Sequence, residues 1–338
     1  MRRRGRSLLW AGLLLGLVLS ISAEPRRRAP RRRPRPAAPS FRADEANDAA
    51  RTPTLRLGNA GSMVVRAQVL LDRAHFSPGE IGGRFEANTR GALAAFRKSH
   101  GLPPGSVVDR ETWGVLNQDA APVVISYAIA QEDVAGPFFE IPDDMLEKAK
   151  LPALGYSSPL EAIGEKFHAS PKLLQELNPG EAFDRAGDEI LVPAIAYDPP
   201  GKAARIVVDG SERAVTAFDR DDRLLAWYPA SVGSRHDPLP VGRWKIRGRR
   251  MDPEFHYNPD LFWDAEPSSE RATIPPGPNN PVGRVWIDLS KPHYGIHGTP
   301  EPETIGKTQS HGCIRLTNWD ALELAEMVSP GTPAVLRR

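Results

Sequence analysis

Cysteine is nearly absent from the sequence, which has one, Cys313, in 338 residues. A chain with a single cysteine cannot form an internal disulfide. The thiol is a small buried hydrophobe in one interpretation and a free reactive group in the other. The residues around Cys313 decide between the two.

Net charge is also small, +2 at pH 7, but it is unevenly distributed. Residues 1–40 contain eleven arginines and one glutamate. Residues 41–338 therefore hold 33 basic and 41 acidic residues, a formal charge of −8. The basic character belongs to the N-terminal segment alone, so it does not indicate a nucleic-acid-binding protein.

Long apolar runs are scarce. The most extended one, residues 8–21, is shorter than the roughly 18–20 residues of a membrane-spanning helix. A basic start at 2–6 precedes it, and Ser22 and Ala23 follow, which is the pattern of a secretory signal peptide over 1–23. An uncleaved membrane anchor is the alternative. In both cases the rest of the chain leaves the cytoplasm, and only an uncleaved anchor would contact the membrane.

Proline and arginine are interleaved in the segment that follows, residues 24–53. Such a segment buries too little apolar surface to offset the entropy of ordering, so we predict a solvated linker. A basic tether lying on anionic lipid or polymer is the alternative.

Apolar residues at helical spacing predict three short helices within residues 54–120. The first covers about 65–76, and the second begins with Asn88 or Thr89 as its cap. The third covers 109–116. Glycine-rich turns separate the helices, so this region reads as a small helical domain.

Residues 121–197 have a different order, with strand-like runs at 123–129 and 189–193 on either side of two short helices. Residues 134–157 interrupt the connection from the first strand to the first helix.

From residue 203 onward the pattern is mainly β, with turn signals between strands as in a sandwich or barrel. One helix is expected at 319–328, with Thr317 or Asn318 as its cap and Asp320 in its first turn. Residues 247–283 form a long interruption, typical of a functional flap or a disordered loop. The expected strands are 205–209, 214–218, 224–230, 242–246 and 284–289. The predicted fold class is therefore multidomain α+β.

The surroundings of Cys313 favour the reactive thiol. It lies in Ser-His-Gly-Cys-Ile-Arg at 310–315, sixteen residues after His297, which Gly298 follows. A cysteine nucleophile needs a base, a group that orients the base, and backbone donors for an oxyanion. Gly312 allows the backbone to approach a carbonyl closely, and a helix that begins near Asn318 adds some positive potential.

A zinc site is the competing interpretation, because His293, His297, His311 and Cys313 are ligand types that zinc accepts. Proline and glycine around them disfavour a helical His-x-x-x-His pair, and no glutamate follows His293. We therefore expect no metal and no cofactor.

Together these residues resemble the catalytic signature of the L,D-transpeptidases with a YkuD-type domain, and the resemblance covers about 203–338. It includes 238–244, and the segment 274–283 is similar to the Gram-negative ErfK/YbiS-like subgroup. Residues 54–120 resemble a peptidoglycan-binding helical domain, through Gly82-Gly83-Arg84-Phe85 and Thr112-Trp113 among others. Residues 121–197 resemble a LysM module, although the insertion at 134–157 leaves its sugar binding open.

The resemblance implies a role for each site residue. Cys313 would be the nucleophile, His297 the general base and the Gly298 carbonyl its orienting group. The N–H groups of Gly312 and Cys313 would hold the oxyanion, and His311 would support the geometry of the site. Substrate contacts would come from Arg315, Ser310 and Tyr294; Arg315 could instead brace the loop, and Ser310 could order it.

The implied reaction begins when Cys313 is acylated by a peptidoglycan stem tetrapeptide and D-alanine leaves. Transfer to an amine then gives a 3–3 cross-link or attaches a lipoprotein. An L,D-carboxypeptidase or wall-peptide hydrolase on the same scaffold is the alternative, and a wall-binding protein with an inactive catalytic domain is a third. The expected partners are peptidoglycan and, as a second acceptor, a lipoprotein, with no nucleic acid, at a periplasmic or cell-wall location.

Overall fold

The computed structural model describes residues 41–195, 198–263 and 270–338. The predicted signal peptide at 1–23 lies outside this range, as does the first part of the predicted linker. Within the described residues, no helix has both the length and the apolar character needed to cross a membrane.

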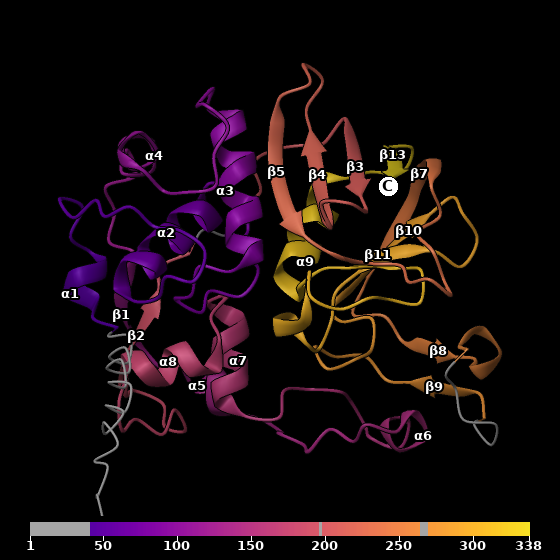
Figure 1. Ribbon diagram of the computed structural model, residues 1–338. Helices are drawn as coiled ribbons and strands as arrows, with labels where there is room; N and C mark the ends of the chain where they lie inside the picture. Colours follow the sequence, from indigo (N-terminus) through magenta and orange to yellow (C-terminus); the bar gives the residue numbers. More distant parts are fainter. Residues whose placement is uncertain (1–40, 196–197, 264–269) are drawn as a thin grey trace, which may run out of the picture. The chain divides into compact units, whose positions relative to one another are not determined.

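The helical region contains the three predicted helices and one more (Figure 1). Asp109 caps the last of them by accepting a hydrogen bond from the Thr112 backbone N–H at 2.9 Å. The predicted start of the second helix was wrong, because the helix begins at Ala87 with Glu86 as its N-cap. The four helices are α1 (Ala43–Ala46), α2 (Ser62–Arg73), α3 (Ala87–Ser99) and α4 (Arg110–Leu116).

The two residues expected to cap that helix have other partners. Asn88 donates to the Ile305 carbonyl at 2.9 Å, far along the chain. Thr89 is buried and accepts a hydrogen bond from Gln68 at 3.0 Å. Both side chains therefore bond other segments of the chain and do not cap the start of the helix.

The predicted linker over 24–53 was too long, because residues 41–53 belong to the fold. Helix α1 lies within this stretch and packs on α2. Ala46 is 1% exposed, and Phe41 and Ala43 pack against the helical core. These apolar side chains supply the buried surface that the proline–arginine segment before them lacks.

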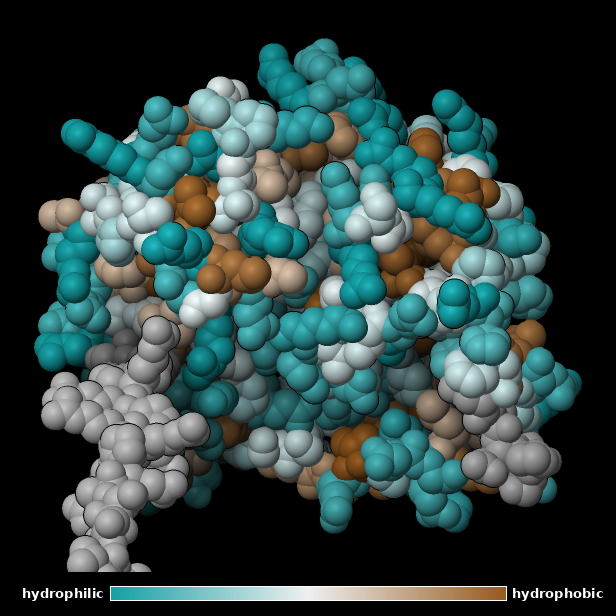
Figure 2. All heavy atoms as spheres, viewed as in Figure 1, coloured by the Kyte–Doolittle hydropathy of each residue, from teal (hydrophilic) through white to brown (hydrophobic). Residues whose placement is uncertain are grey.

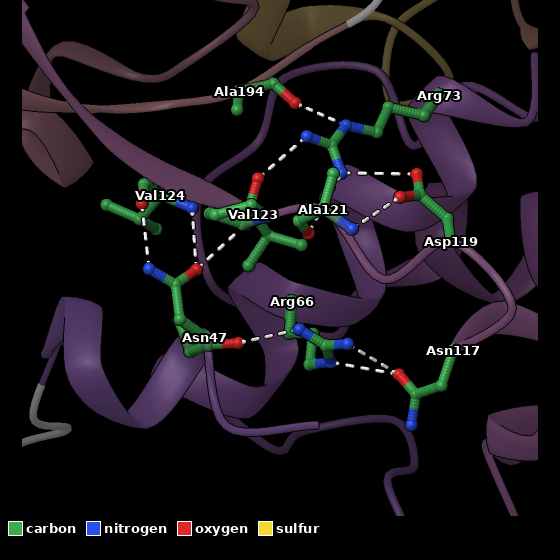
Figure 3. A network of polar contacts seen from close by, with 11 residues as sticks. Asn47, Arg66, Arg73, Asn117, Asp119, Ala121, Val123, Val124 and Ala194 are labelled. Atoms are coloured by element: carbon green, nitrogen blue, oxygen red, sulfur yellow. Dashed lines mark hydrogen bonds and ion pairs between the residues drawn. The ribbon is translucent and has the colours of Figure 1, made fainter.

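Two arginines on α2 tie the helical region together (Figure 3). Arg66 is 1% exposed, and its guanidinium donates to the Asn117 side-chain oxygen at 2.7 and 3.0 Å and to the Ala46 carbonyl. Arg73 donates to the carbonyls of Pro122 and Ala194, at 2.7 and 2.6 Å. The planar guanidinium can bond several acceptors at once, which suits it to this position.

Asn47 completes the same network (Figure 3). Its side-chain oxygen accepts hydrogen bonds from the backbone N–H groups of Val123 and Val124, at 2.8 and 3.0 Å. Its amide nitrogen donates to the Val124 carbonyl at 2.8 Å. The segment after α1 is thereby joined to the first strand of the next region.

That next region has the predicted strand–helix–helix–strand order. Strands β1 (Val124–Ala128) and β2 (Glu189–Pro193) pair antiparallel, with Ser126 opposite Leu191. Helices α7 (Pro159–Lys166) and α8 (Pro171–Leu177) lie between them in the chain. We call residues 121–195 the βααβ module.

Helix α5 (Gln131–Val134) leads into the insertion at 134–157, which holds α6 (Met145–Lys148). Its residue Leu154 is buried in a small core with Tyr257 and Ile274 of the C-terminal region. The Leu154 backbone N–H also donates to the Pro276 carbonyl at 2.9 Å. Figure 1 shows α6 beside β8 and β9, so the insertion reaches the C-terminal region.

The C-terminal region is built on one curved sheet. In the described part of the chain it has nine strands, in the order β5-β4-β3-β13-β7-β10-β11-β12-β6. The two edge strands, β5 (Leu224–Pro229) and β6 (Ser231–Val232), are separated by Ala230 alone, so the sheet must curl until its edges nearly meet. The result is a nearly closed barrel. The remaining strands are β3 (Arg205–Asp209), β4 (Ala214–Phe218), β7 (Gly242–Met251), β10 (Val285–Leu289), β11 (Gly295–His297), β12 (Ile314–Arg315) and β13 (Pro333–Arg337).

The predicted interruption at 247–283 was wrong at its start, because β7 continues to Met251. The second half of this strand has no apolar pattern in the sequence, because most of its side chains face solvent and three of them are arginines, Arg247, Arg249 and Arg250. The rest contains β8 (Phe255–Tyr257), the 3₁₀ helix η1 (Pro259–Leu261) and β9 (Ala272–Ile274), with β8 and β9 paired antiparallel.

Helix α9 (Asn318–Met327) covers the sheet and begins one residue before its predicted start. Thr317 caps it by accepting from the Asp320 backbone N–H at 3.1 Å, as one of the two predictions had it. Ala321, Leu324 and Ala325 pack into the same core as Ile287 and Ile296.

The helical region, the βααβ module and the C-terminal region pack together within one compact unit. Trp227 of β5 and Leu173 of α8 belong to the same buried cluster as the helical region. Gly91 of α3 makes room for the indole, because an added Cβ would lie 2.7 Å from Trp227. On the face shown in Figure 2, apolar side chains lie in small groups among hydrophilic ones.

We expect Arg73→Ala to lower the free energy of unfolding by about 1–2 kcal/mol, because the part-buried Ala194 carbonyl and the exposed Pro122 carbonyl lose their donor. Urea denaturation followed by far-UV circular dichroism measures the change. Arg56→Ala is the matched control, since that exposed arginine should change stability by less than about 0.5 kcal/mol. Equal midpoints for the two variants would contradict the bracing role of Arg73.

Candidate active site

Strand pairing brings the His-Gly segment against the cysteine segment. Strands β11 and β12 run parallel, with Ile296 opposite Ile314 and His297 opposite Arg315. Cys313 lies immediately before β12. His297 therefore lies on the strand next to the one that Cys313 precedes, opposite Arg315.

The ring of His297 is fixed in a buried position. It is 5% exposed, and Nδ1 lies 2.7 Å from the Gly298 carbonyl oxygen. A carbonyl only accepts hydrogen bonds, so Nδ1 carries the proton and Nε2 of the neutral ring is left as an acceptor.

Trp286 covers this ring from the neighbouring strand. It lies directly opposite His297 in the pairing of β10 with β11, and the two rings stack at 5.4 Å with 15° between their planes. Gly295 clears the space, because an added Cβ would lie 2.5 Å from the indole. The sequence prediction placed Trp286 in a strand but gave it no part in the site.

Burial sets the ionisation of both predicted catalytic residues. It lowers the pKa of His297 to about 4, with the Gly298 hydrogen bond opposing the shift and the Arg315 charge adding to it. Burial raises the pKa of Cys313 to about 11, against a hydrogen bond with the Gly295 backbone and the charge of Arg315. At pH 7 the pair is therefore a neutral thiol and a neutral imidazole.

The turn before Cys313 depends on glycine. Gly312 has φ +96°, and an added Cβ would lie 2.8 Å from Tyr294, so a side chain is excluded for two reasons. Ser310 donates from its hydroxyl to the Cys313 carbonyl, which closes the turn. The Cys313 thiol donates to the His293 carbonyl at 3.8 Å.

Tyr294 lies beside the thiol. Burial raises its pKa, and the negative charges of Cys313 and Asp237 raise it further. Ser310, Gly312 and Tyr294 therefore lie around Cys313, while His297 and Gly298 bond each other at the end of the neighbouring strand.

Arg315 and His311 point elsewhere. Arg315 donates to the Thr308 hydroxyl at 3.2 Å and to the Gln309 carbonyl, so it braces the loop before the cysteine. The exposed His311 contacts Phe262 and Trp263, at 5.0 and 6.0 Å between ring centroids. These aromatics belong to the long loop, and sequence reasoning noted them only as part of its composition.

Asn318 is a further residue of the site region that the sequence indicated only as a possible helix cap. It is 0% exposed, and its side-chain oxygen accepts from the Arg284 backbone N–H at 3.0 Å. An added Cβ on Gly298 would lie 2.1 Å from the same oxygen, so this amide is in direct contact with the His-Gly peptide.

The zinc interpretation finds no support in the described residues, where no group of three or more His, Cys, Asp or Glu could hold a metal ion. His293 presents its backbone carbonyl to the thiol, and Nδ1 of His297 is bonded to a carbonyl. The arrangement suits acyl transfer by a thiol, with a histidine oriented by a carbonyl as its base.

Comparisons with known proteins agree with this chemistry. The model of the YkuD L,D-transpeptidase catalytic domain matches residues 203–336, and that of a peptidoglycan binding domain matches 60–116. YkuD of Bacillus licheniformis, named as an L,D-transpeptidase, is 36% identical over 175 residues, 51% of this chain and 90% of that protein. YbiS of Escherichia coli K12, also named as an L,D-transpeptidase, is 27% identical over 184 residues, 53% of this chain and 60% of that protein.

Among solved structures, an L,D-transpeptidase from Xylanimonas cellulosilytica is similar at 16% identity and a TM-score of 0.37, covering 89% of this chain and 100% of that one. With a YkuD-type catalytic domain at 203–336 and a peptidoglycan-binding domain at 60–116, the chain belongs to the L,D-transpeptidase family.

Proposed function

We propose that this L,D-transpeptidase works through Cys313 as nucleophile and His297 as general base, on a peptidoglycan stem tetrapeptide. The observation that carries the proposal is the 2.7 Å hydrogen bond from His297 Nδ1 to the Gly298 carbonyl. It leaves Nε2 unprotonated on a ring that lies one strand away from the thiol.

The first half-reaction starts from the neutral pair. The sulfur attacks the carbonyl carbon of the third stem residue while His297 Nε2 takes the thiol proton. The N–H groups of Gly312 and Cys313 hold the oxyanion in the turn that the positive φ of Gly312 creates. The C–N bond then breaks, His297 returns the proton to the departing D-alanine nitrogen, and a thioester on Cys313 remains.

The second half-reaction depends on the acceptor. An amine from a neighbouring stem gives a 3–3 cross-link, and a lipoprotein lysine gives an anchored protein. In each case His297 takes a proton from the attacking amine and the thiol leaves. Water in that place makes the enzyme an L,D-carboxypeptidase, which is the alternative function.

The two N-terminal regions have different parts in this proposal. Residues 60–116 bind peptidoglycan and keep the enzyme at its polymer. The βααβ module has the element order of a LysM fold, which is why we propose that likeness. Its strand-to-helix connection contacts the loop at 275–283, between β9 and β10, through Leu154 and Gly155, so we propose that it holds that loop and does not grip glycan.

An enzyme that acts on the cell wall works outside the cytoplasm. The more specific assignments, to the ErfK/YbiS-like subgroup and to the periplasm, are proposals supported by the residues of 274–283 and by the predicted export signal.

Incubation with purified tetrapeptide muropeptides tests the nucleophile. Wild-type protein should release D-alanine, and Cys313→Ala should release none, because no thioester can form. Mass spectrometry of the muropeptides and of the intact protein measures both. Release that survives in Cys313→Ala would contradict the assignment.

The same assay with an added acceptor amine separates transfer from hydrolysis. A transpeptidase yields cross-linked dimers, whereas a carboxypeptidase yields only shortened monomers. If no dimers form at any acceptor concentration, the enzyme is an L,D-carboxypeptidase and not a transpeptidase.

The pH dependence of donor acylation tests the state of the base. Because protonated His297 cannot accept the thiol proton, kcat/KM should rise with pH around a midpoint near 4, whereas an ordinary histidine gives about 6.5. Trp286→Ala opens the ring to water and should move the midpoint upward. Circular dichroism at each pH confirms that the protein stays folded, and a wild-type midpoint near 6.5 would refute the buried neutral base.

A further inference from the structure

The Asn318 side chain is held at both ends by atoms of other segments. Its amide nitrogen donates to the two Glu165 carboxylate oxygens, at 2.9 and 3.1 Å, and to the Pro278 carbonyl at 3.2 Å. Its oxygen accepts from the Arg284 backbone N–H. Glu165 belongs to α7, so the strongest acceptor of this amide comes from the βααβ module.

The other side of the same amide faces the catalytic backbone. Glycines at 283 and 298 leave just enough room, since an added Cβ on either would lie 2.0 or 2.1 Å from the Asn318 oxygen. The Gly298 N–H also donates to the Val285 carbonyl at 3.3 Å, next to the residue that Asn318 binds. A shift of this amide would therefore move the peptide whose carbonyl orients His297.

Glu165 is itself fixed in place. The Tyr156 hydroxyl donates to its carboxylate at 3.2 Å. Partial removal from water raises the pKa of Glu165 to about 7, against the hydrogen bonds from Asn318 and Tyr156 and the charge of Arg284, with Glu161 raising it further. One turn earlier on α7, Glu161 accepts a hydrogen bond from Asn279 at 2.8 Å, whereas the Asn318 amide bonds Glu165 and Pro278.

We propose that Glu165 is a positioning residue for the reaction. It holds the Asn318 amide, whose oxygen lies against Gly298, and this packing fixes the peptide whose carbonyl orients His297. The proposal rests on the role of His297 as base. It makes the βααβ module part of the support of the active site.

Steady-state kinetics of D-alanine release by the full chain provide the first test. Glu165→Ala should lower kcat roughly 10- to 100-fold with little change in KM, because the base is displaced and the substrate contacts are not. Glu165→Gln keeps one acceptor oxygen and should recover most of the rate. Glu161 lies one helical turn from Glu165 on α7. The kcat of Glu161→Ala should stay within about twofold of the wild-type value.

A hydrogen-bond swap keeps the test decisive even where Glu165→Ala does not fold. Asn318→Asp places two carboxylates together and should lower kcat at least tenfold. Adding Glu165→Gln supplies a new donor to that carboxylate and should restore part of the rate. A double variant no faster than Asn318→Asp alone would overturn the direct pairing.

Nitrogen-15 NMR of histidine-labelled protein reads the tautomer without any turnover. In wild type, His297 should show a protonated Nδ1, with the signal assigned by its loss in His297→Gln. In Glu165→Ala this signal should shift toward a mixture of tautomers. Unchanged His297 signals and an unchanged kcat would overturn the proposal, as would equal losses in Glu165→Ala and Glu161→Ala.

The NMR result separates this inference from the proposed function. A wild-type protein that releases no D-alanine would contradict the proposed transpeptidase function. A His297 signal that depends on Glu165 would still support the positioning role.

Discussion

The site depends on one hydrogen bond, from His297 Nδ1 to the carbonyl of the next residue. A carbonyl carries no net charge, so it fixes the tautomer and raises the pKa of the ring less than a carboxylate would. Burial under Trp286 then keeps the ring neutral. Removal from water raises the pKa of the part-exposed Cys313 thiol to about 11, so both groups are neutral at pH 7 and form no ion pair.

The relative position of His297 and Cys313 is set by backbone pairing. His297 ends β11 and Cys313 precedes β12, and the parallel register of the two strands fixes their separation. Three glycines serve contacts that no other residue allows: Gly295 under the indole, Gly298 against Asn318 and Gly312 beside Tyr294. In the proposed reaction the chemistry belongs to two side chains, and these glycines place the segments that carry them.

The sequence alone was enough to propose the chemical residues, because the candidate nucleophile, base and flexible turn all lie within 297–315. It did not predict what supports them. Trp286 and Asn318 act through pairing and packing across segments, which no local pattern encodes. Strand β13 was not predicted for the same reason, because its partners β3 and β7 are distant in the chain. The linker prediction failed from residue 41 because Phe41 and Ala46 find their apolar partners only in the folded helical region.

The βααβ module contacts the C-terminal region at the loop 275–283 and at Asn318, whose amide bonds Pro278 of that loop. Leu154 bonds Pro276 and Asn279 through its backbone, and Glu165 bonds the amide of Asn318. Removing Glu165 would leave the buried Asn318 nitrogen with the Pro278 carbonyl as its acceptor, at the longer distance of 3.2 Å. An under-bonded buried amide costs roughly 1–3 kcal/mol, enough to favour a rearranged loop over the one that faces His297. A module that precedes the catalytic residues in the chain therefore acts on them through the Gly298 peptide.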